Sequence, residues 1–163
     1  MKKRMAIFCG SALGVNSSFS QQAQLVVRQL VKHDFDLVYG GASVGIMGVI
    51  ADEFLRLKRE VVGIIPEFLS NLELSHLGLT NLLVVESMHE RKQKMYDHSH
   101  AFMALPGGMG TLDELCEIIT WAQLSHHHKP IYIYNDRGYY DHFVLHIQAM
   151  AENGFLKREH LKK

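Results

Sequence analysis

The chain has 163 residues, of which 47% are hydrophobic and 21% are charged, and these values are ordinary for a globular domain. The 17 basic residues balance the 17 acidic ones, so the formal net charge is zero. This balance argues against a protein that binds nucleic acid through bulk positive charge, whereas a local cluster could still hold a small anion. No apolar run reaches the length of a membrane span or a signal peptide, so we expect a cytoplasmic protein.

Apolar runs typical of strands alternate along the chain with segments of helical periodicity. In chain order, the pattern predicts a strand at 5–10, a helix from Ser17 or Ser18 to His33, a strand at 36–39, a helix at 44–57 and a strand at 61–65 that Pro66 ends. It then predicts a strand at 82–85, a helix at 88–98, a strand at 101–105, a helix at 111–124, a strand at 131–134 and a helix at 140–152. Such βαβ units predict an α/β fold with a Rossmann-like, three-layer, doubly wound parallel sheet, in a single domain over residues 1–163.

The longest connection without assigned structure is 66–80, where we expect a short helical turn and a segment that helps to close a site. Cys9 lies in an apolar run and Cys116 in a helical pattern, and together they form neither a CxxC pair nor a disulfide framework. We therefore expect both thiols to be buried and reduced.

Ligands of open parallel sheets bind at the carboxyl ends of the strands, so the turns that follow the strands are the places to search for a site. The first distinctive turn lies within 39–48 and contains Gly40, Gly41 and Gly45. Glycines before a helix let the backbone approach an anion, yet the spacing matches neither the dinucleotide fingerprint nor a P-loop. A tight turn that only packs a helix on the sheet explains this segment equally well.

A second turn follows the predicted strand 101–105 and reads Pro-Gly-Gly-Met-Gly-Thr-Leu-Asp-Glu over residues 106–114. Three glycines in four positions before a helix are typical of a cradle for phosphate or sugar oxygens. The alternative is a capping box, in which Thr111 caps the helix and Glu114 folds back onto it, while Asp113 complements the helix dipole. The glycines exceed what a cap requires, so we favour a functional site.

The third turn, over 86–92, opens a helix with Arg91 and Lys92 near its start. Cations at this end oppose the helix dipole, and such a local inconsistency is where function is expected. The guanidinium could hold a phosphate or position a carboxylate. The alternative is a solvated charged face on which Glu90 and Lys94 pair.

The order of the motifs YGGxxxGxMG, SMHERK, PGGxGTxxE and ITWAQL resembles the LOG family of cytokinin riboside 5'-monophosphate phosphoribohydrolases, long mislabelled as lysine decarboxylases. The resemblance covers the chain from Ile7 to about Leu156. It implies a Rossmann-like fold, a homodimer, and hydrolysis of the N-glycosidic bond of a nucleoside 5'-monophosphate to a free base and ribose 5-phosphate. It implies no cofactor, no metal and no nucleic-acid or membrane partner.

The resemblance also assigns roles to residues. Arg91 and Glu114 match the catalytic pair, in which the carboxylate stabilises positive charge on the ribose and activates water while the guanidinium orients it. The substrate-binding positions are Gly40, Gly41, Gly45, Glu73, Met88, Lys92, Gly107, Gly108, Met109, Gly110, Thr111, Leu112, Asp113 and Thr120. The chain departs from the pattern at Ala42, where many relatives have a third consecutive glycine.

Two other functions fit parts of the sequence. A noncatalytic protein that binds a nucleotide or the molybdenum cofactor could share the fold, although the presence of both Arg91 and Glu114 favours an enzyme. A lysine decarboxylase would need a Schiff-base lysine for pyridoxal phosphate, and no lysine lies in a suitable turn. The run 126–128 of three histidines is expected to be structural or exposed, because adjacent residues rarely supply metal geometry.

Overall fold

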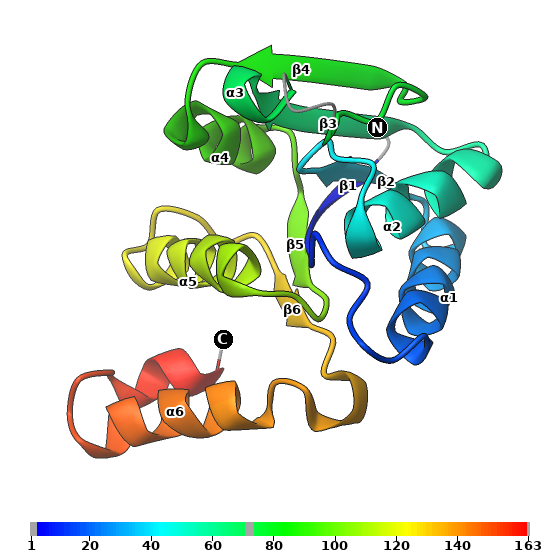
Figure 1. Cartoon of the computed structure of the whole chain (residues 1–163). Helices are drawn as coiled ribbons and strands as arrows, with labels where there is room; N and C mark the ends of the chain where they lie inside the picture. Colours follow the sequence, from blue (N-terminus) through cyan, green and yellow to red (C-terminus); the bar gives the residue numbers. More distant parts are fainter. Residues whose placement is uncertain (1–2, 71–73, 163) are drawn as a thin grey trace.

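Six parallel strands form one sheet in the order β4-β3-β2-β1-β5-β6, in a computed structural model that describes residues 3–70 and 74–162 (Figure 1). The strands are β1 (Lys3–Phe8), β2 (Phe35–Tyr39), β3 (Val61–Pro66), β4 (Asn81–Val85), β5 (Ala101–Ala104) and β6 (Ile131–Ile133). The helices are α1 (Ser18–Lys32), α2 (Gly45–Arg56), α3 (Glu67–Leu69), α4 (Met88–Asp97), α5 (Met109–Gln123) and α6 (Asp141–Glu152), with 3-10 turns η2 (Asp136–Gly138) and η3 (Arg158–Lys162).

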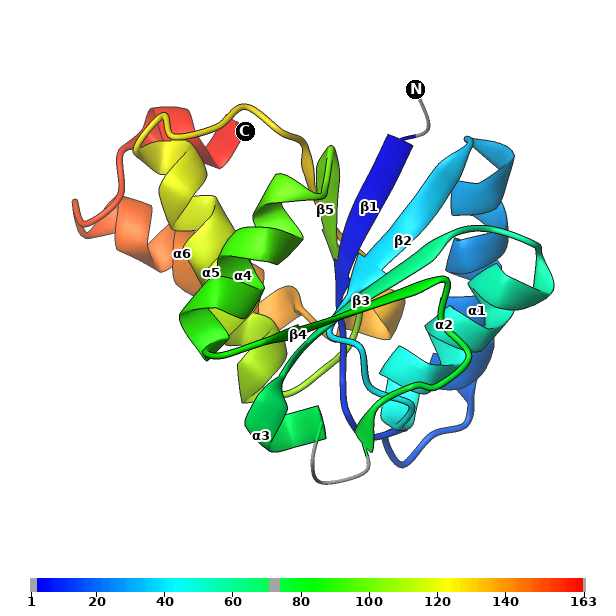
Figure 2. The ribbon, with the colours of Figure 1, turned by 90° about the horizontal axis from the view of Figure 1, so that it is seen from above.

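The direction in which the chain adds strands reverses once. β1 to β4 extend the sheet one way, and the chain then returns to place β5 on the free side of β1. Because crossovers between parallel strands are right-handed, this reversal puts α1 and α2 on one face and α4 and α5 on the other (Figure 2). The predicted doubly wound α/β fold is confirmed, and the reversal beside β1 is where such folds bind ligands.

Both faces of the sheet are covered by apolar side chains that alternate along the strands. Met5 and Ile7 of β1 pack with α1 and α2, whereas Ala6 and Phe8 of the same strand pack beneath α4 and α5. Every residue of β3 is buried. This double coverage explains why the strands are continuous apolar runs in the sequence.

Three details differ from or refine the predictions. α5 begins at Met109, two residues before the predicted Thr111. Pro66 is the last residue of β3 and pairs with Val85, which a strand end tolerates although proline has no N–H to donate. The predicted helical turn in the β3–β4 connection is confirmed as α3.

The two cysteines differ in exposure. Cys9 is buried as predicted, but the prediction for Cys116 is wrong, because this residue lies on the outer side of α5 and is exposed. The helical pattern placed Cys116 beside buried Leu115 and did not say which way each turn faces. Within the described part of the chain, no helix is long and apolar enough to cross a membrane.

Candidate active site

A cavity of about 350 Å³ lies beyond the carboxyl ends of β1, β2 and β3, beside the point where the strand order reverses. Residues from the turns after β1 and β2 meet there with α4 and the start of α5. The predicted site residues that line it are Gly40, Met88, Arg91, Gly108, Met109, Gly110, Thr111, Asp113 and Glu114. The structure therefore brings the three sequence motifs together around one space.

The start of α4 places Arg91 against this cavity. Ser87 caps the helix by accepting a hydrogen bond from the Glu90 N–H at 3.1 Å, and the Glu90 carboxylate accepts one from the Glu86 N–H at 3.0 Å. Arg91, in the same turn, is 9% exposed, and its Nε donates to the Ile64 carbonyl at 3.1 Å. Its Nη1 donates to Met88 Sδ at 3.8 Å, so the guanidinium is fixed near the end of β3 with Nη2 directed towards Glu114.

Glu114 faces Arg91 from α5. Its Oε1 lies 3.8 Å from Arg91 Nη2, and the residue is 9% exposed. Burial raises the pKa of Glu114 to about 7 although the charges of Arg91 and Lys92 lower it, and the charges of Asp113 and Glu117 add to the rise. A carboxyl group with this pKa can hold or release a proton near neutral pH, as a general acid or base requires.

The capping alternative for Glu114 is wrong. The N-cap of α5 is Gly108, and among the described residues no side chain caps this helix. Since Thr111 then lies inside the helix, Glu114 comes in its second turn and faces the cavity instead of folding back on the helix start. The side-chain cap of the site is instead Ser87 at the start of α4, which accepts a hydrogen bond from the Glu90 N–H.

The uncapped start of α5 opens onto the cavity. Gly108, Met109, Gly110 and Thr111 all line it, and the first amides of a helix have no partner within the helix. The turn before them is fixed to β1, because the Gly10 N–H donates to the Pro106 carbonyl at 3.1 Å. This end of the cavity can therefore bind an anion such as a phosphate through backbone N–H groups.

Lys92 lies next to the cavity and does not line it. Its Nζ is 2.8 Å from Asp113 Oδ2 and 3.5 Å from Glu117 Oε2, and only 16% of its side chain is exposed. Burial lowers the pKa of Lys92, but the hydrogen bond to Asp113 and the charges of both carboxylates outweigh burial and raise it. The ammonium group thus joins α4 to α5 beside the Arg91–Glu114 pair.

Other predicted residues support the turns around the cavity. Gly41 and Gly45 have φ values of +78° and +61°, which favour glycine, so they shape the turn after β2. A side chain on Gly107 would overlap Thr111 Oγ1. Leu112 packs against the buried cluster around Leu115 instead of the cavity.

Thr120, another predicted binding residue, is not at the cavity. The Thr120 hydroxyl donates to the Cys116 carbonyl at 2.7 Å, on an exposed part of α5. Glu73 lies outside the described residues. The structure therefore gives Thr120 no place in the candidate site, and the role of Glu73 stays a prediction.

Sequence reasoning missed the apolar part of the lining. Cys9 lines the cavity just after β1, and burial raises the pKa of its thiol, with the Glu114 charge acting in the same direction. The rule that ligands bind at strand ends could have found Cys9, whereas Leu69 and Leu74 carry no motif. Both leucines come from the β3–β4 connection, which helps to close the site as predicted.

The histidine run has a structural explanation. His127 is 5% exposed, its Nδ1 accepts a hydrogen bond from the Lys129 N–H at 3.1 Å, and its Nε2 therefore donates to the Ile118 carbonyl at 3.0 Å. Burial lowers the pKa of His127. The ring connects α5 to the segment before β6 and uses both nitrogens to do so.

Comparison with solved structures bears on the fold. The Moco carrier protein from Chlamydomonas reinhardtii aligns with a TM-score of 0.69 and 16% identity, over 89% of this chain and 84% of that one. The molybdenum cofactor binding protein from the phototrophic bacterium Rippkaea orientalis aligns with a TM-score of 0.70 and 19% identity, over 94% of this chain and 85% of that one. These similarities establish a common fold.

Comparison of sequences bears on the family. The family model described as "Possible lysine decarboxylase" matches residues 47–163. Cytokinin riboside 5'-monophosphate phosphoribohydrolase LOG1 of Arabidopsis thaliana is 44% identical over 154 residues, which are 94% of this chain and 72% of the relative. The probable enzyme LOGL3 of Oryza sativa subsp. japonica is 42% identical over 154 residues, 94% of this chain and 73% of the relative. The chain therefore belongs to the LOG family, the family of the cytokinin riboside 5'-monophosphate phosphoribohydrolases.

Proposed function

We propose that this protein hydrolyses the N-glycosidic bond of a nucleoside 5'-monophosphate and releases the free base and ribose 5-phosphate. The observation that carries the proposal is the buried Arg91–Glu114 pair, 3.8 Å apart, in one cavity with the uncapped start of α5. The names of the plant relatives, at 41–44% identity, point to the same reaction. AMP and cytokinin riboside 5'-monophosphates are the substrates to test first.

The phosphate binds at the start of α5 in this proposal. The amides of Gly108, Met109 and Gly110 supply N–H groups, and the positive end of the helix dipole favours the negative charge. Because backbone N–H groups bind the phosphate dianion in this proposal, the protein needs no excess of basic residues. The zero net charge of the chain agrees with this. The Thr111 hydroxyl, which also lines the cavity, can donate a hydrogen bond to the phosphate, and the Asp113 carboxylate can accept hydrogen bonds from the ribose hydroxyls.

Glu114 and Arg91 carry out the chemistry. As the bond between C1' of the ribose and the base nitrogen breaks, its electron pair leaves with the base, and positive charge develops on the ribose. The ionised Glu114 carboxylate stabilises that charge and removes a proton from the water that attacks C1', and this proton passes on to the nitrogen of the departing base. Arg91, held by the Ile64 carbonyl, orients the carboxylate and contacts the ribose or the phosphate.

The other assignments implied by the family stay part of the proposal. Met88 lines the cavity near the pair, and Gly40 leaves room for the guanidinium. Lys92 lies beside the cavity and acts on the site by holding α5 in place. Roles for Gly41, Gly45, Gly107, Leu112, Thr120 and Glu73 as binding residues rest on the family resemblance alone.

A noncatalytic binding protein for a nucleotide or the molybdenum cofactor is the second candidate, because structural neighbours named for the molybdenum cofactor share the fold. Incubation of the purified protein with AMP or a cytokinin riboside 5'-monophosphate, followed by an assay for free base and ribose 5-phosphate, separates the two. We expect both products, and none with Glu114→Gln. Tight binding of the nucleotide without product formation would favour the second candidate.

The assembly and location are part of the same proposal. The family resemblance implies a homodimer, and light scattering of the purified protein during size-exclusion chromatography measures its mass directly. A mass equal to one chain would contradict the dimer. Fractionation of the source cells tests the cytoplasmic location that the sequence predicts.

A further inference from the structure

The connection between β6 and α6 passes beneath the turn that precedes α5. Arg137 and Gly138 have φ values of +51° and +77°, so two successive left-handed residues reverse the chain there. This reversal is costly for an arginine, and a conformation of this kind persists only where the surroundings enforce it. Its result is that Tyr139 and Tyr140 point back towards the end of β5.

Both tyrosine hydroxyls donate to carbonyls of this turn. Tyr140 donates to the Leu105 carbonyl at 2.7 Å, and Tyr139 donates to the Gly107 carbonyl at 2.6 Å. The carbonyl between them, that of Pro106, accepts from the Gly10 N–H at 3.1 Å. Three successive peptide groups therefore have their carbonyl oxygens fixed by other parts of the chain.

A fixed carbonyl also fixes the neighbouring N–H. In a trans peptide the C=O of one residue and the N–H of the next point in opposite directions. The hydroxyl of Tyr139 holds the Gly107 carbonyl, so the N–H of Gly108 points away from Tyr139. Gly108 lines the cavity and Tyr139 does not, so this N–H is directed to the side where an anion would bind.

The ring of Tyr139 is itself held in place. It packs edge-on against Phe19 of α1, with ring centroids 5.8 Å apart, and against Tyr140 at 5.0 Å. The hydroxyl can therefore act on the turn as a fixed donor, even though the residue is 45% exposed. The rings also remain packed if only the hydroxyl is removed, which makes a clean variant possible.

We propose that Tyr139 is a positioning residue that aims the Gly108 N–H at the 5'-phosphate of the substrate. This inference rests on the proposed phosphoribohydrolase function. It assigns Tyr139 a role in phosphate recognition that acts through the backbone, with no contact between tyrosine and substrate. It therefore predicts a defect that depends on whether the substrate carries a phosphate.

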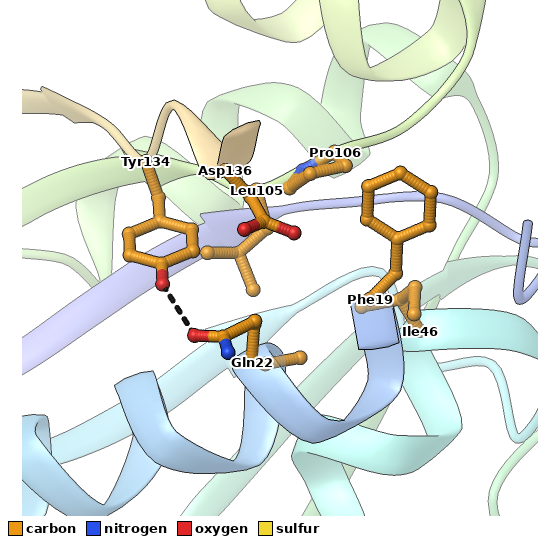
Figure 3. Close-up of a pocket in the computed structure, with 8 residues that line it drawn as sticks. Phe19, Gln22, Ile46, Leu105, Pro106, Tyr134 and Asp136 are labelled. Carbon is orange, nitrogen blue, oxygen red and sulfur yellow. Dashed lines mark hydrogen bonds between the residues drawn. The ribbon is translucent and has the colours of Figure 1, made fainter. Parts of the chain in front are cut away.

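Tyr139→Phe tests the proposal with two substrates, AMP and adenosine. We expect the KM for AMP to rise about tenfold, the lower end of the effect of one hydrogen bond to a charged group, while kcat with AMP and kcat/KM with adenosine change less than twofold. The matched control is Tyr134→Phe, which removes the hydroxyl that donates to Gln22 Oε1 at 2.8 Å and leaves the glycine turn untouched (Figure 3). Both variants are first checked for cooperative thermal unfolding.

Calorimetric titration with inorganic phosphate provides a readout that does not depend on turnover. We expect Tyr139→Phe to weaken phosphate binding by a similar factor and Tyr134→Phe to leave it unchanged. An equal loss with AMP and adenosine, or an unchanged KM for AMP in Tyr139→Phe, would overturn the role of Tyr139. Absence of hydrolysis by the wild type would instead refute the proposed function. The phosphate titration would still test whether Tyr139 directs the Gly108 N–H towards a bound phosphate.

Discussion

Gly40 and Arg91 share a space that admits only one side chain. A methyl group on Gly40 would overlap Nη2 of Arg91, and it would also lie 3.1 Å from the guanidinium carbon and 3.2 Å from Met47 Sδ. The reason for glycine at position 40 is therefore the guanidinium, because it is the next residue, Gly41, that has the positive φ of the turn. The first glycine motif and the arginine motif of the sequence thus form one structural unit.

Gly40→Ala should displace the guanidinium from Glu114 without unfolding the chain. A displacement of about 1 Å at a catalytic group can lower activity by about two orders of magnitude, and we expect a loss of kcat/KM of that order. The control is a double-mutant cycle with Arg91→Ala, in which Gly40→Ala should cost little once the guanidinium is gone. Equal losses in both backgrounds would mean that Gly40 acts independently of Arg91.

Glu114→Gln should abolish turnover and largely preserve substrate binding. The amide keeps the size of the side chain but can neither remove a proton nor neutralise positive charge on the ribose, so we expect kcat to fall by about three orders of magnitude. Glu117→Gln is the matched control, because Glu117 lies one turn further along α5, and its loss leaves the shorter Lys92–Asp113 pair of 2.8 Å to join the helices, so kcat should fall far less. Measured turnover of Glu114→Gln close to the wild-type rate would remove Glu114 from the mechanism.

Much of this arrangement follows from the sequence. Continuous apolar runs such as Val61–Pro66 locate strands buried on both faces, and the rule for the carboxyl ends of parallel strands brings the three turns together. The pairing of Arg91 with Glu114 came from the family resemblance. The local sequence around Arg91 or Glu114 does not predict that the two side chains meet, because only the fold brings α4 next to α5.

The direction in which each side chain faces was harder to predict. The Thr111–Glu114 spacing matches a capping box, and only the start of α5 at Met109 shows that Glu114 is free to enter the cavity. Lys92 follows Arg91 directly in the sequence, yet it points to Asp113 and Glu117. The way in which two helices pack decides the direction in which each side chain points. The spacing of residues in a motif carries no information about that packing.

The activity should depend on the ionisation of Glu114. Its pKa of about 7 means that the free enzyme holds the neutral acid below neutral pH and the carboxylate above it. Because the carboxylate is the active form in the proposed mechanism, kcat/KM should rise with pH and level off above about 7. The phosphate of the substrate titrates near pH 6, so adenosine, which has no phosphate, is the control substrate. A pH-independent rate with adenosine between pH 5 and 8 would contradict this assignment.

The raised pKa of Glu114 should also make the free energy of unfolding depend on pH in a defined direction. The folded-state pKa lies above the ordinary value of 4.5, so the neutral acid stabilises the fold fully below about pH 4.5, and this contribution is lost as the pH rises through about 7. The loss amounts to about 3 kcal/mol at most. Urea unfolding at pH 5 and pH 9 should therefore give a smaller difference for Glu114→Gln than for the wild type or Glu117→Gln. Identical differences in all three proteins would mean that Glu114 has an ordinary pKa.

Lys92→Met tests whether Lys92 contacts the nucleotide or acts through α5. Its ammonium group lies between Asp113 and Glu117, so its removal should loosen α5 against α4 and disturb Glu114, which stands between these two acids in the sequence. We expect kcat to fall about tenfold, with little change in KM and a loss of about 1 kcal/mol in the free energy of unfolding.

The control for this variant is Lys94→Met, which removes the partly exposed pair with Glu90 at 3.5 Å on the same helix and should leave both constants near their wild-type values. A tenfold rise in KM at constant kcat in Lys92→Met would instead show that the ammonium group binds the substrate directly. In that case the Lys92 side chain would have to leave Asp113 and Glu117 when the nucleotide enters. The two acids would then release the lysine that now joins the helices, so α5 would be held less firmly in the complex than in the free enzyme. Hydrogen exchange of the α5 amides with and without ribose 5-phosphate would detect that difference.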